Sequence, residues 1–72
     1  MKNRLKALRL DRHWTQEGLA NALCVSRQTI IAIEKGKYAP SLPLVFRMSR
    51  VLERPIDAIF FQDDEDPQGP AS

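Results

Sequence analysis

The stretch Thr15–Lys37, TQEGLANALCVSRQTIIAIEKGK, decides the fold because it contains two helix starts separated by a very short link. Thr15 and Ser26 are good N-cap residues, whose side-chain oxygens accept hydrogen bonds from free N–H groups of the first turn. Each cap follows a large apolar residue that has an apolar partner further along, as in a hydrophobic staple. The staple pairs are Trp14 with Leu19 and Val25 with Ile30. These signals predict helices that begin at Gln16 and at Arg27.

The apolar residues of this stretch have helical spacing. One stripe consists of Leu19, Ala20 and Leu23, and a second consists of Ile30 and Ile33. This spacing is typical of helices that bury one face. Because only Cys24, Val25 and Ser26 lie between the end of the first stripe at Leu23 and the helix start at Arg27, the two helices must meet at a steep angle. The stretch therefore predicts a helix-turn-helix.

The flanking sequence supplies three further helices. A helix over residues 3–12 would turn Leu5 and Leu8 inward, with Arg4, Lys6 and Arg12 on its other side. Gly36 suits the left-handed residue that ends a helix, and Tyr38–Pro40 forms a loop. Ser41 would cap a fourth helix that has Pro43 in its first turn. Its apolar stripe is Leu44, Val45, Met48, Val51 and Leu52.

Pro55 would start a short fifth helix, whose Ile56, Ile59 and Phe60 close the core. The fold class predicted is therefore all-α, a compact five-helix domain over residues 1–61. Residues 62–72 contain four acids, two prolines and no large apolar residue, which predicts a disordered acidic tail.

The charge of the chain is unevenly distributed. The net charge of +2 arises from eleven Lys and Arg less five Asp and Glu in residues 1–61, which is +6, and four acids in residues 62–72, which is −4. A basic domain is the electrostatic footprint of a nucleic-acid binder, since phosphate neutralisation supplies most of the non-specific affinity. Charge alone is a weak signal, because many solvated faces are equally basic.

Several short motifs resemble those of one known family. They are Thr15-Gln16-Glu17, Leu19-Ala20, Val25-Ser26-Arg27-Gln28-Thr29-Ile30 and Ile33-Glu34-Lys35-Gly36-Lys37. In combination they resemble the small single-domain members of the lambda-repressor/Cro-like (XRE-like) helix-turn-helix family. The resemblance implies a sequence-specific transcriptional regulator that binds double-stranded DNA. We also expect a homodimer on a pseudo-palindromic operator, with half-sites about 34 Å apart.

The candidate base-reading residues are Arg27, Gln28 and Thr29, at the start of the second helix of the motif. Arg can donate two hydrogen bonds to guanine and Gln can pair with adenine, each contact contributing roughly 1–3 kcal/mol of discrimination. Without the flanking pattern, Arg27 and Gln28 would be read as solvated first-turn residues. Ile31 points away from the predicted core, so Ile31 and Ala32 are candidates for contact with thymine methyls. A single exposed isoleucine is also common in itself.

The resemblance implies a second set of residues that hold the DNA backbone without reading sequence. Gln16 occupies the position that clamps a phosphate, while Lys35, Lys37, Tyr38 and Ser41 occupy positions that grip the backbone after the reading helix. Arg9 and Glu34 match an internal ion pair of many family members. We interpret that pair as structural.

Two residues carry separate hypotheses. Phe61 would point away from the core stripe that ends at Phe60, which makes it a candidate anchor for the dimer interface. Cys24 stands in the turn where the family usually has glycine, so a left-handed backbone is expected there at a cost of roughly 1–2 kcal/mol. A redox-sensing thiol at Cys24 is the less favoured alternative.

Other functional classes are not supported by the sequence. Its single cysteine and single histidine make neither an internal disulfide nor a protein-only metal cage, and we expect no cofactor and no enzymatic activity. The chain contains no membrane span or secretion signal, so we expect a cytoplasmic, nucleoid-associated protein. The rival hypothesis is an antitoxin or antirepressor that binds a protein partner, with the tail as contact or DNA mimic. A simpler reading is that the tail screens the domain from non-specific DNA.

Overall fold

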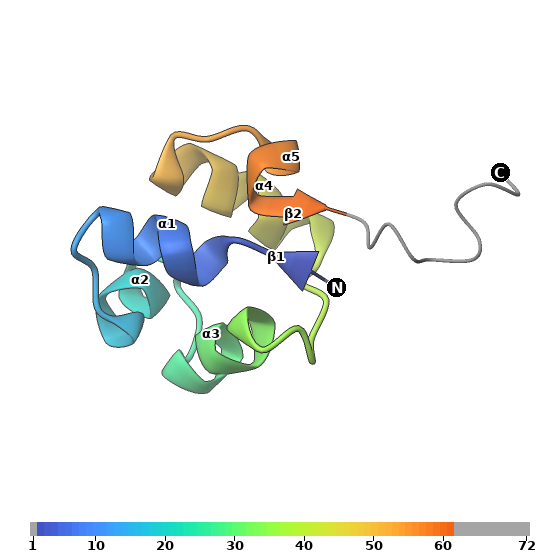
Figure 1. Ribbon diagram of the computed structural model, residues 1–72. Helices are drawn as coiled ribbons and strands as arrows, with labels where there is room; N and C mark the ends of the chain where they lie inside the picture. The colour runs from blue at the N-terminus through green and yellow to red at the C-terminus, as the bar shows by residue number, and fades with distance from the viewer. Residues whose placement is uncertain (1, 62–72) are drawn as a thin grey trace, which may run out of the picture.

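The computed structural model describes residues 2–61, and within them it contains five helices and two very short strands (Figure 1). The order along the chain is β1 (Lys2–Asn3), α1 (Leu5–Asp11), α2 (Gln16–Leu23), α3 (Arg27–Glu34), α4 (Leu42–Leu52), α5 (Ile56–Ile59) and β2 (Phe60–Phe61). The mainly helical class and the number of helices predicted from the sequence are confirmed. The acidic tail, residues 62–72, lies outside the described residues.

The helix-turn-helix forms where the caps predict it. The Thr15 hydroxyl accepts a hydrogen bond from the Gly18 N–H at 2.9 Å, and the Ser26 hydroxyl accepts one from the Thr29 N–H at 3.1 Å. Both caps have the extended backbone that an N-cap requires. Trp14 and Val25 are partly buried against the core, as the staples predict.

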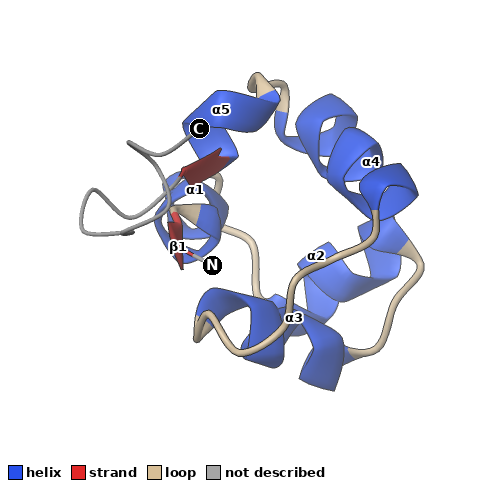
Figure 2. Ribbon diagram, turned by 90° about the vertical axis from the view of Figure 1, so that its right-hand side faces the viewer, coloured by secondary structure: helices blue, strands red, loops and turns tan. Residues whose placement is uncertain are grey.

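The core lies where the faces of all five helices meet, and its side chains come from every helix (Figure 2). Full burial of one such aliphatic side chain contributes about 1.5–3 kcal/mol relative to exposure. The predicted stripes of α2, α3 and α4 are in this core, with Leu8, Val51 and Ile56 packed at its edge. Its buried members are Leu5, Leu19, Ala20, Leu23, Ile30, Ile33, Leu44, Val45, Met48, Leu52, Ile59 and Phe60.

The start of α4 differs from the prediction in one detail. Ser41 occupies the N-cap position with an extended backbone and Pro43 lies in the first turn, but the Ser41 side chain makes no capping hydrogen bond. The fixed φ of proline favours helical geometry in this turn and leaves one N–H fewer to satisfy. The helix therefore starts without the hydroxyl cap that the sequence suggested.

The first helix is shorter than predicted, and this part of the prediction is wrong. The helix begins at Leu5 and ends at Asp11. Asn3 forms β1 with Lys2, and this strand pairs antiparallel with β2: Lys2 lies opposite Phe61 and Asn3 opposite Phe60. The Asn3 side chain accepts a hydrogen bond from the Leu5 N–H at 3.0 Å and donates one to the Ile33 carbonyl at 2.7 Å. The placement of Phe60 in the fifth helix is also wrong, because α5 ends at Ile59 and Phe60 lies with Phe61 in β2.

Candidate nucleic-acid interface

The turn between α2 and α3 holds the two helices in a fixed relation. Cys24 adopts the left-handed conformation, with φ of 60° and ψ of 41°, as the sequence predicts. The Val25 N–H then donates back to the Ala20 carbonyl at 3.0 Å, and the Arg47 guanidinium of α4 donates to the Leu23 carbonyl at 2.6 Å. The last carbonyls of α2 therefore have partners, and the direction of α3 is set by the turn.

Arg27 and Gln28 are exposed on the first turn of α3, and neither makes a hydrogen bond or ion pair with any described residue. Thr29 differs, because its hydroxyl lies 2.9 Å from the Ser26 hydroxyl and its side chain is half-buried. Its methyl group, rather than its hydroxyl, is the better candidate for a base contact. Ile31 and Ala32 are half-buried outside the core.

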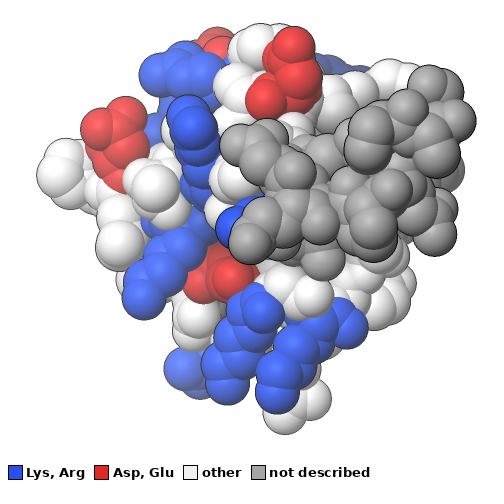
Figure 3. All heavy atoms as spheres, turned by 45° about the vertical axis from the view of Figure 1, so that its right-hand side comes forward, with Lys and Arg blue, Asp and Glu red and all other residues white. Residues whose placement is uncertain are grey.

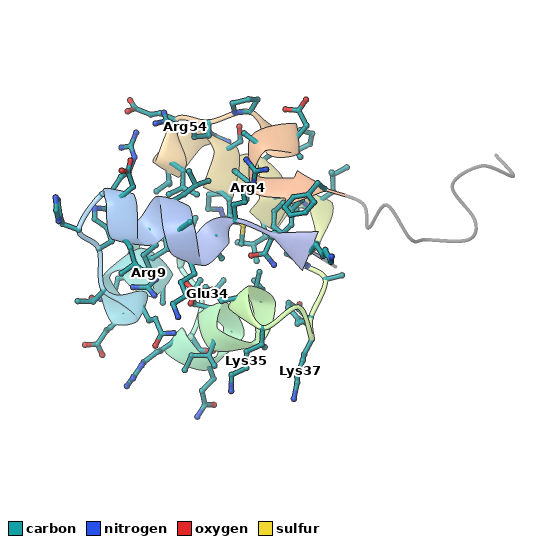
Figure 4. The ribbon with its side chains drawn as sticks, in the orientation of Figure 1. Arg4, Arg9, Glu34, Lys35, Lys37 and Arg54 are labelled. Carbon is teal, nitrogen blue, oxygen red and sulfur yellow. The ribbon has the colours of Figure 1, made fainter. Side chains whose placement is uncertain are left out.

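A buried ion pair links α1 to the end of α3. The Arg9 Nε donates to the Glu34 carboxylate at 2.7 Å, and the two side chains are 8% and 5% exposed. Arg9 also donates to the Trp14 carbonyl at 2.8 Å, and the Gln16 amide donates to Glu34 at 3.2 Å. Figure 4 shows Arg9 of α1 pointing toward Glu34 at the end of α3. The structural role assigned to this pair agrees with the geometry.

The first residue of α2 is held beside that ion pair. Gln16, predicted to clamp a phosphate, uses one amide N–H for Glu34 and retains a second for another acceptor. It borders a groove of about 570 Å³ that is lined by Lys6, Arg9, Thr15, Gln16, Glu17 and Arg27. Lys6 was not among the sequence-predicted site residues, because it was assigned to the solvated side of the first helix. Lys6 lies three residues before Arg9, one helical turn away, and this spacing could have predicted that the two side chains lie on the same face of α1.

The other end of α3 is closed by a glycine turn. Gly36 has φ of 75°, its N–H donates to the Ile33 carbonyl at 2.9 Å, and the Lys37 N–H donates to the Ala32 carbonyl at 3.0 Å. This pair of bonds is the Schellman motif, and it confirms the helix end predicted at Gly36. Lys35, Lys37, Tyr38 and Ser41 follow, all exposed.

Basic side chains gather around both ends of α3. Figure 4 shows Lys35 and Lys37 extending from the end of α3 in the same direction, away from the body of the domain. In Figure 3 lysine and arginine side chains occupy much of the face, with fewer acids between them. The structure thus places exposed Arg27 and Gln28 between cationic groups on both sides. It does not test which residues bind DNA, so those assignments stay predictions.

Two remaining predicted features lie elsewhere. Phe61 is 39% exposed, and the Arg4 guanidinium lies over its ring, 5.3 Å from the centroid. Cys24 is exposed. Within residues 2–61 there is no cluster of three side chains able to hold a metal ion, and none of the helices there is long and apolar enough to cross a membrane.

Comparison with known proteins gives consistent matches. A helix-turn-helix family model matches residues 5–59. An uncharacterized HTH-type transcriptional regulator of Methanocaldococcus jannaschii, MJ0272, is 53% identical over 66 residues, covering 92% of this chain and all of that protein. The regulator YgzD of Bacillus subtilis is 38% identical over 65 residues, covering 90% of this chain and 98% of YgzD.

Solved structures share the fold. The restriction-modification controller protein C.AhdI of Aeromonas hydrophila is 26% identical with a TM-score of 0.72, covering 79% of this chain and 86% of that one. A hypothetical transcription factor from Neisseria, NHTF, has a TM-score of 0.70 at 22% identity, covering 76% of this chain and 62% of that one.

Proposed function

We propose that this chain, which belongs to the helix-turn-helix family of DNA-binding transcriptional regulators, binds a specific operator. According to this proposal, α3 reads the sequence of the operator in the major groove. In this proposal the protein is a homodimer in the cytoplasm, and each copy contacts one half-site of a pseudo-palindrome. Arg27 and Gln28 contact base edges. Gln16, Lys35 and Lys37 contact phosphates on either side.

The observation that carries the proposal is that the side chains of Arg27 and Gln28 are available for binding. Both side chains are exposed on the first turn of α3 and have no partner among the described residues, while the helix below them is fixed by the Ser26 cap and by buried Ile30 and Ile33. Because the helix backbone is already ordered, binding has to order only the side chains of these donors. Arg27 can donate to guanine and Gln28 can pair with adenine in the major groove.

Electrostatics supports the same orientation. Lys6 and Arg27 border the groove at the start of α2, and Lys35 and Lys37 follow the far end of α3. A duplex lying along α3 would therefore meet cations on both sides of the base-reading residues. Such contacts raise affinity for any sequence and make binding depend steeply on salt.

The test is fluorescence anisotropy of the purified protein on its own upstream DNA and on a scrambled duplex, at several salt concentrations. We expect discrimination of roughly 10³ or more for the parent, in the range typical of specific binders. Arg27→Ala should lose most of that discrimination, because the lost base contact contributes about 1–3 kcal/mol per half-site. Arg50→Ala, which removes the same charge from an exposed position of α4, is the matched control and should keep it.

One observation favours the rival function, a module that binds a protein partner. Leu42 and Phe46 lie one turn apart on α4 and are 63% and 51% exposed. Equal, weak binding to both duplexes with no effect of Arg27→Ala would contradict operator reading and turn attention to this apolar face.

A further inference from the structure

The domain has an open hollow next to Phe61, the last residue that the structure describes. The hollow, of about 240 Å³, is lined by Lys2, Asn3, Glu34, Lys35, Gly36 and Phe61. It therefore lies between the β1–β2 pair and the end of α3, close to the proposed backbone contacts. We call these six residues the chain-end hollow.

The charge of the chain-end hollow is positive. Lys2 and Lys35 line it, and the Arg4 guanidinium lies over the Phe61 ring, 5.3 Å from its centroid. Of the described residues that line the hollow, Glu34 is the one acid, and its carboxylate is already paired with Arg9 at 2.7 Å. The hollow therefore favours an anionic occupant.

The chain itself supplies such an occupant. Phe61 is followed by Gln62 and then by four consecutive acids, Asp63-Asp64-Glu65-Asp66. One residue of extended chain spans at most about 3.3–3.6 Å, so the short chain after Phe61 keeps the four acids close to the hollow. A segment tethered this closely has an effective concentration on the order of millimolar at its site.

Because the hollow is positively charged and the four acids follow Phe61 so closely along the chain, we infer that residues 63–66 dock on the chain-end hollow. There they compete with DNA phosphates for Lys35. The inference rests on the proposed function in one respect, the assignment of Lys35 to the DNA backbone. When DNA binds, the acids must leave Lys35. The tail therefore lowers affinity for specific and non-specific duplexes by a similar factor, because phosphate contacts carry no sequence information.

Docking is tested first without DNA, by two-dimensional ¹H–¹⁵N NMR of the full chain. The neutral-tail variant combines Asp63→Asn, Asp64→Asn, Glu65→Gln and Asp66→Asn. We expect it to shift the amide signals of Asn3, Lys35 and Gly36 and to leave those of α4 in place. Raising salt from about 50 to 500 mM should move the same signals in the parent but not in the variant, since screening weakens exposed charge contacts.

A second variant tests the partner of the tail. Lys35→Gln should weaken docking, so that neutralising the tail in this background shifts Asn3 and Gly36 less than it does in the parent. If the neutral-tail variant leaves the signals of the hollow unmoved in the parent background, the acids do not dock there and the inference is overturned.

The DNA arm measures competition by anisotropy. At about 50 mM salt the neutral-tail variant should bind both the upstream and the scrambled duplex roughly three- to tenfold more tightly than the parent, with the gain shrinking at about 300 mM. The control, Asp11→Asn with Asp57→Asn, removes acids from exposed positions elsewhere, and its gain per charge should be smaller. An equal gain in affinity per neutralised acid would mean that DNA binding depends only on the net charge of the protein. That result would overturn competition between the tail and DNA at Lys35.

The two arms separate this inference from the proposed function. Unmoved NMR signals with intact operator discrimination would contradict docking alone. Shifted signals together with equal, weak binding to both duplexes would contradict operator reading while docking stands.

Discussion

Four residues of this domain hold the left-handed conformation, and they show how far a sequence predicts backbone. Gly36 was predictable because glycine commonly ends a helix in this conformation, and Cys24 because the family that the sequence resembles usually has glycine at that position. His13 and Glu53, with φ of 60° and 55°, end α1 and α4 in the same way. Glutamate does not signal this conformation, and histidine, although enriched in it, is far more common in other backbone states. Their positions follow from where the neighbouring helices must pack.

Cys24→Gly should therefore stabilise the protein. A side chain in the left-handed conformation costs roughly 1–2 kcal/mol, and the larger entropy of glycine in the unfolded chain offsets part of the gain. We expect a net gain of about 0.5–1 kcal/mol, a rise in Tm of several degrees for a domain of this size. Thermal unfolding followed by circular dichroism measures it.

Cys24→Ala is the control, because it removes the thiol but keeps the Cβ atom in the strained conformation. It should leave Tm nearly unchanged. An equal gain from alanine and glycine would assign the effect to the exposed thiol rather than to the backbone.

Sequence reasoning succeeded at the level of elements where the signal is local. Thr15 and Ser26 mark helix starts within one turn, and apolar periodicity marks the buried faces of α2, α3 and α4. It failed at β1 and β2 because strands of two residues have no periodicity, and their pairing joins the two ends of the domain. Asn3 connects β1 to the end of α3 through the Ile33 carbonyl, a long-range bond that no local pattern encodes.

The candidate site shows the same division between local and long-range information. The exposure of Arg27 and Gln28 follows from the cap at Ser26 and from helical spacing. The place of Lys6 beside Gln16 and Arg27 depends on how α1 crosses the motif, which only the packed structure shows. The engagement of Gln16 by Glu34 is likewise a product of packing.

The Arg9–Glu34 pair joins α1, α2 and α3, so its loss should be felt as a loss of global stability. Glu34→Gln would leave the Arg9 charge buried without a counter-ion, and we expect the free energy of unfolding to fall by about 3 kcal/mol. Urea denaturation measures this. Glu53→Gln is the matched control: it removes an ion pair with Arg12 at 3.0 Å in which Glu53 is 74% exposed, and it should cost less than about 1 kcal/mol. Similar losses in the two variants would refute a special role for the buried pair.

At the scale of the whole molecule, the proposed dimer depends on two surfaces of the domain. The first is the basic face around α3. The second is Phe61, which lies in β2 and is fixed to the domain by the β1–β2 pair. In the proposed function one α3 contacts one major groove, so recognition of two half-sites would require a second copy whose position is fixed.

Phe61 is the anchor that we expect for that second copy. Its ring is 39% exposed and one cation, Arg4, lies over it, so a partner surface would remove apolar area from water without breaking the core. Phe61→Ser should therefore shift sedimentation velocity at micromolar concentration from dimer toward monomer and reduce operator affinity, while the far-ultraviolet circular dichroism stays that of the parent. Buried aromatic anchors commonly cost 2 kcal/mol or more of binding energy when truncated, which is roughly a 30-fold weaker dimer.

Phe46→Ser provides the decisive comparison, because Phe46 is an aromatic of similar exposure, 51%, on a different element, α4. If Phe61 anchors the dimer, Phe46→Ser should sediment as the parent does. If instead Phe61→Ser remains as dimeric as the parent and Phe46→Ser dissociates, the interface lies on α4. The two reading helices would then be related by a different axis, and the half-site spacing expected of the operator would change with it.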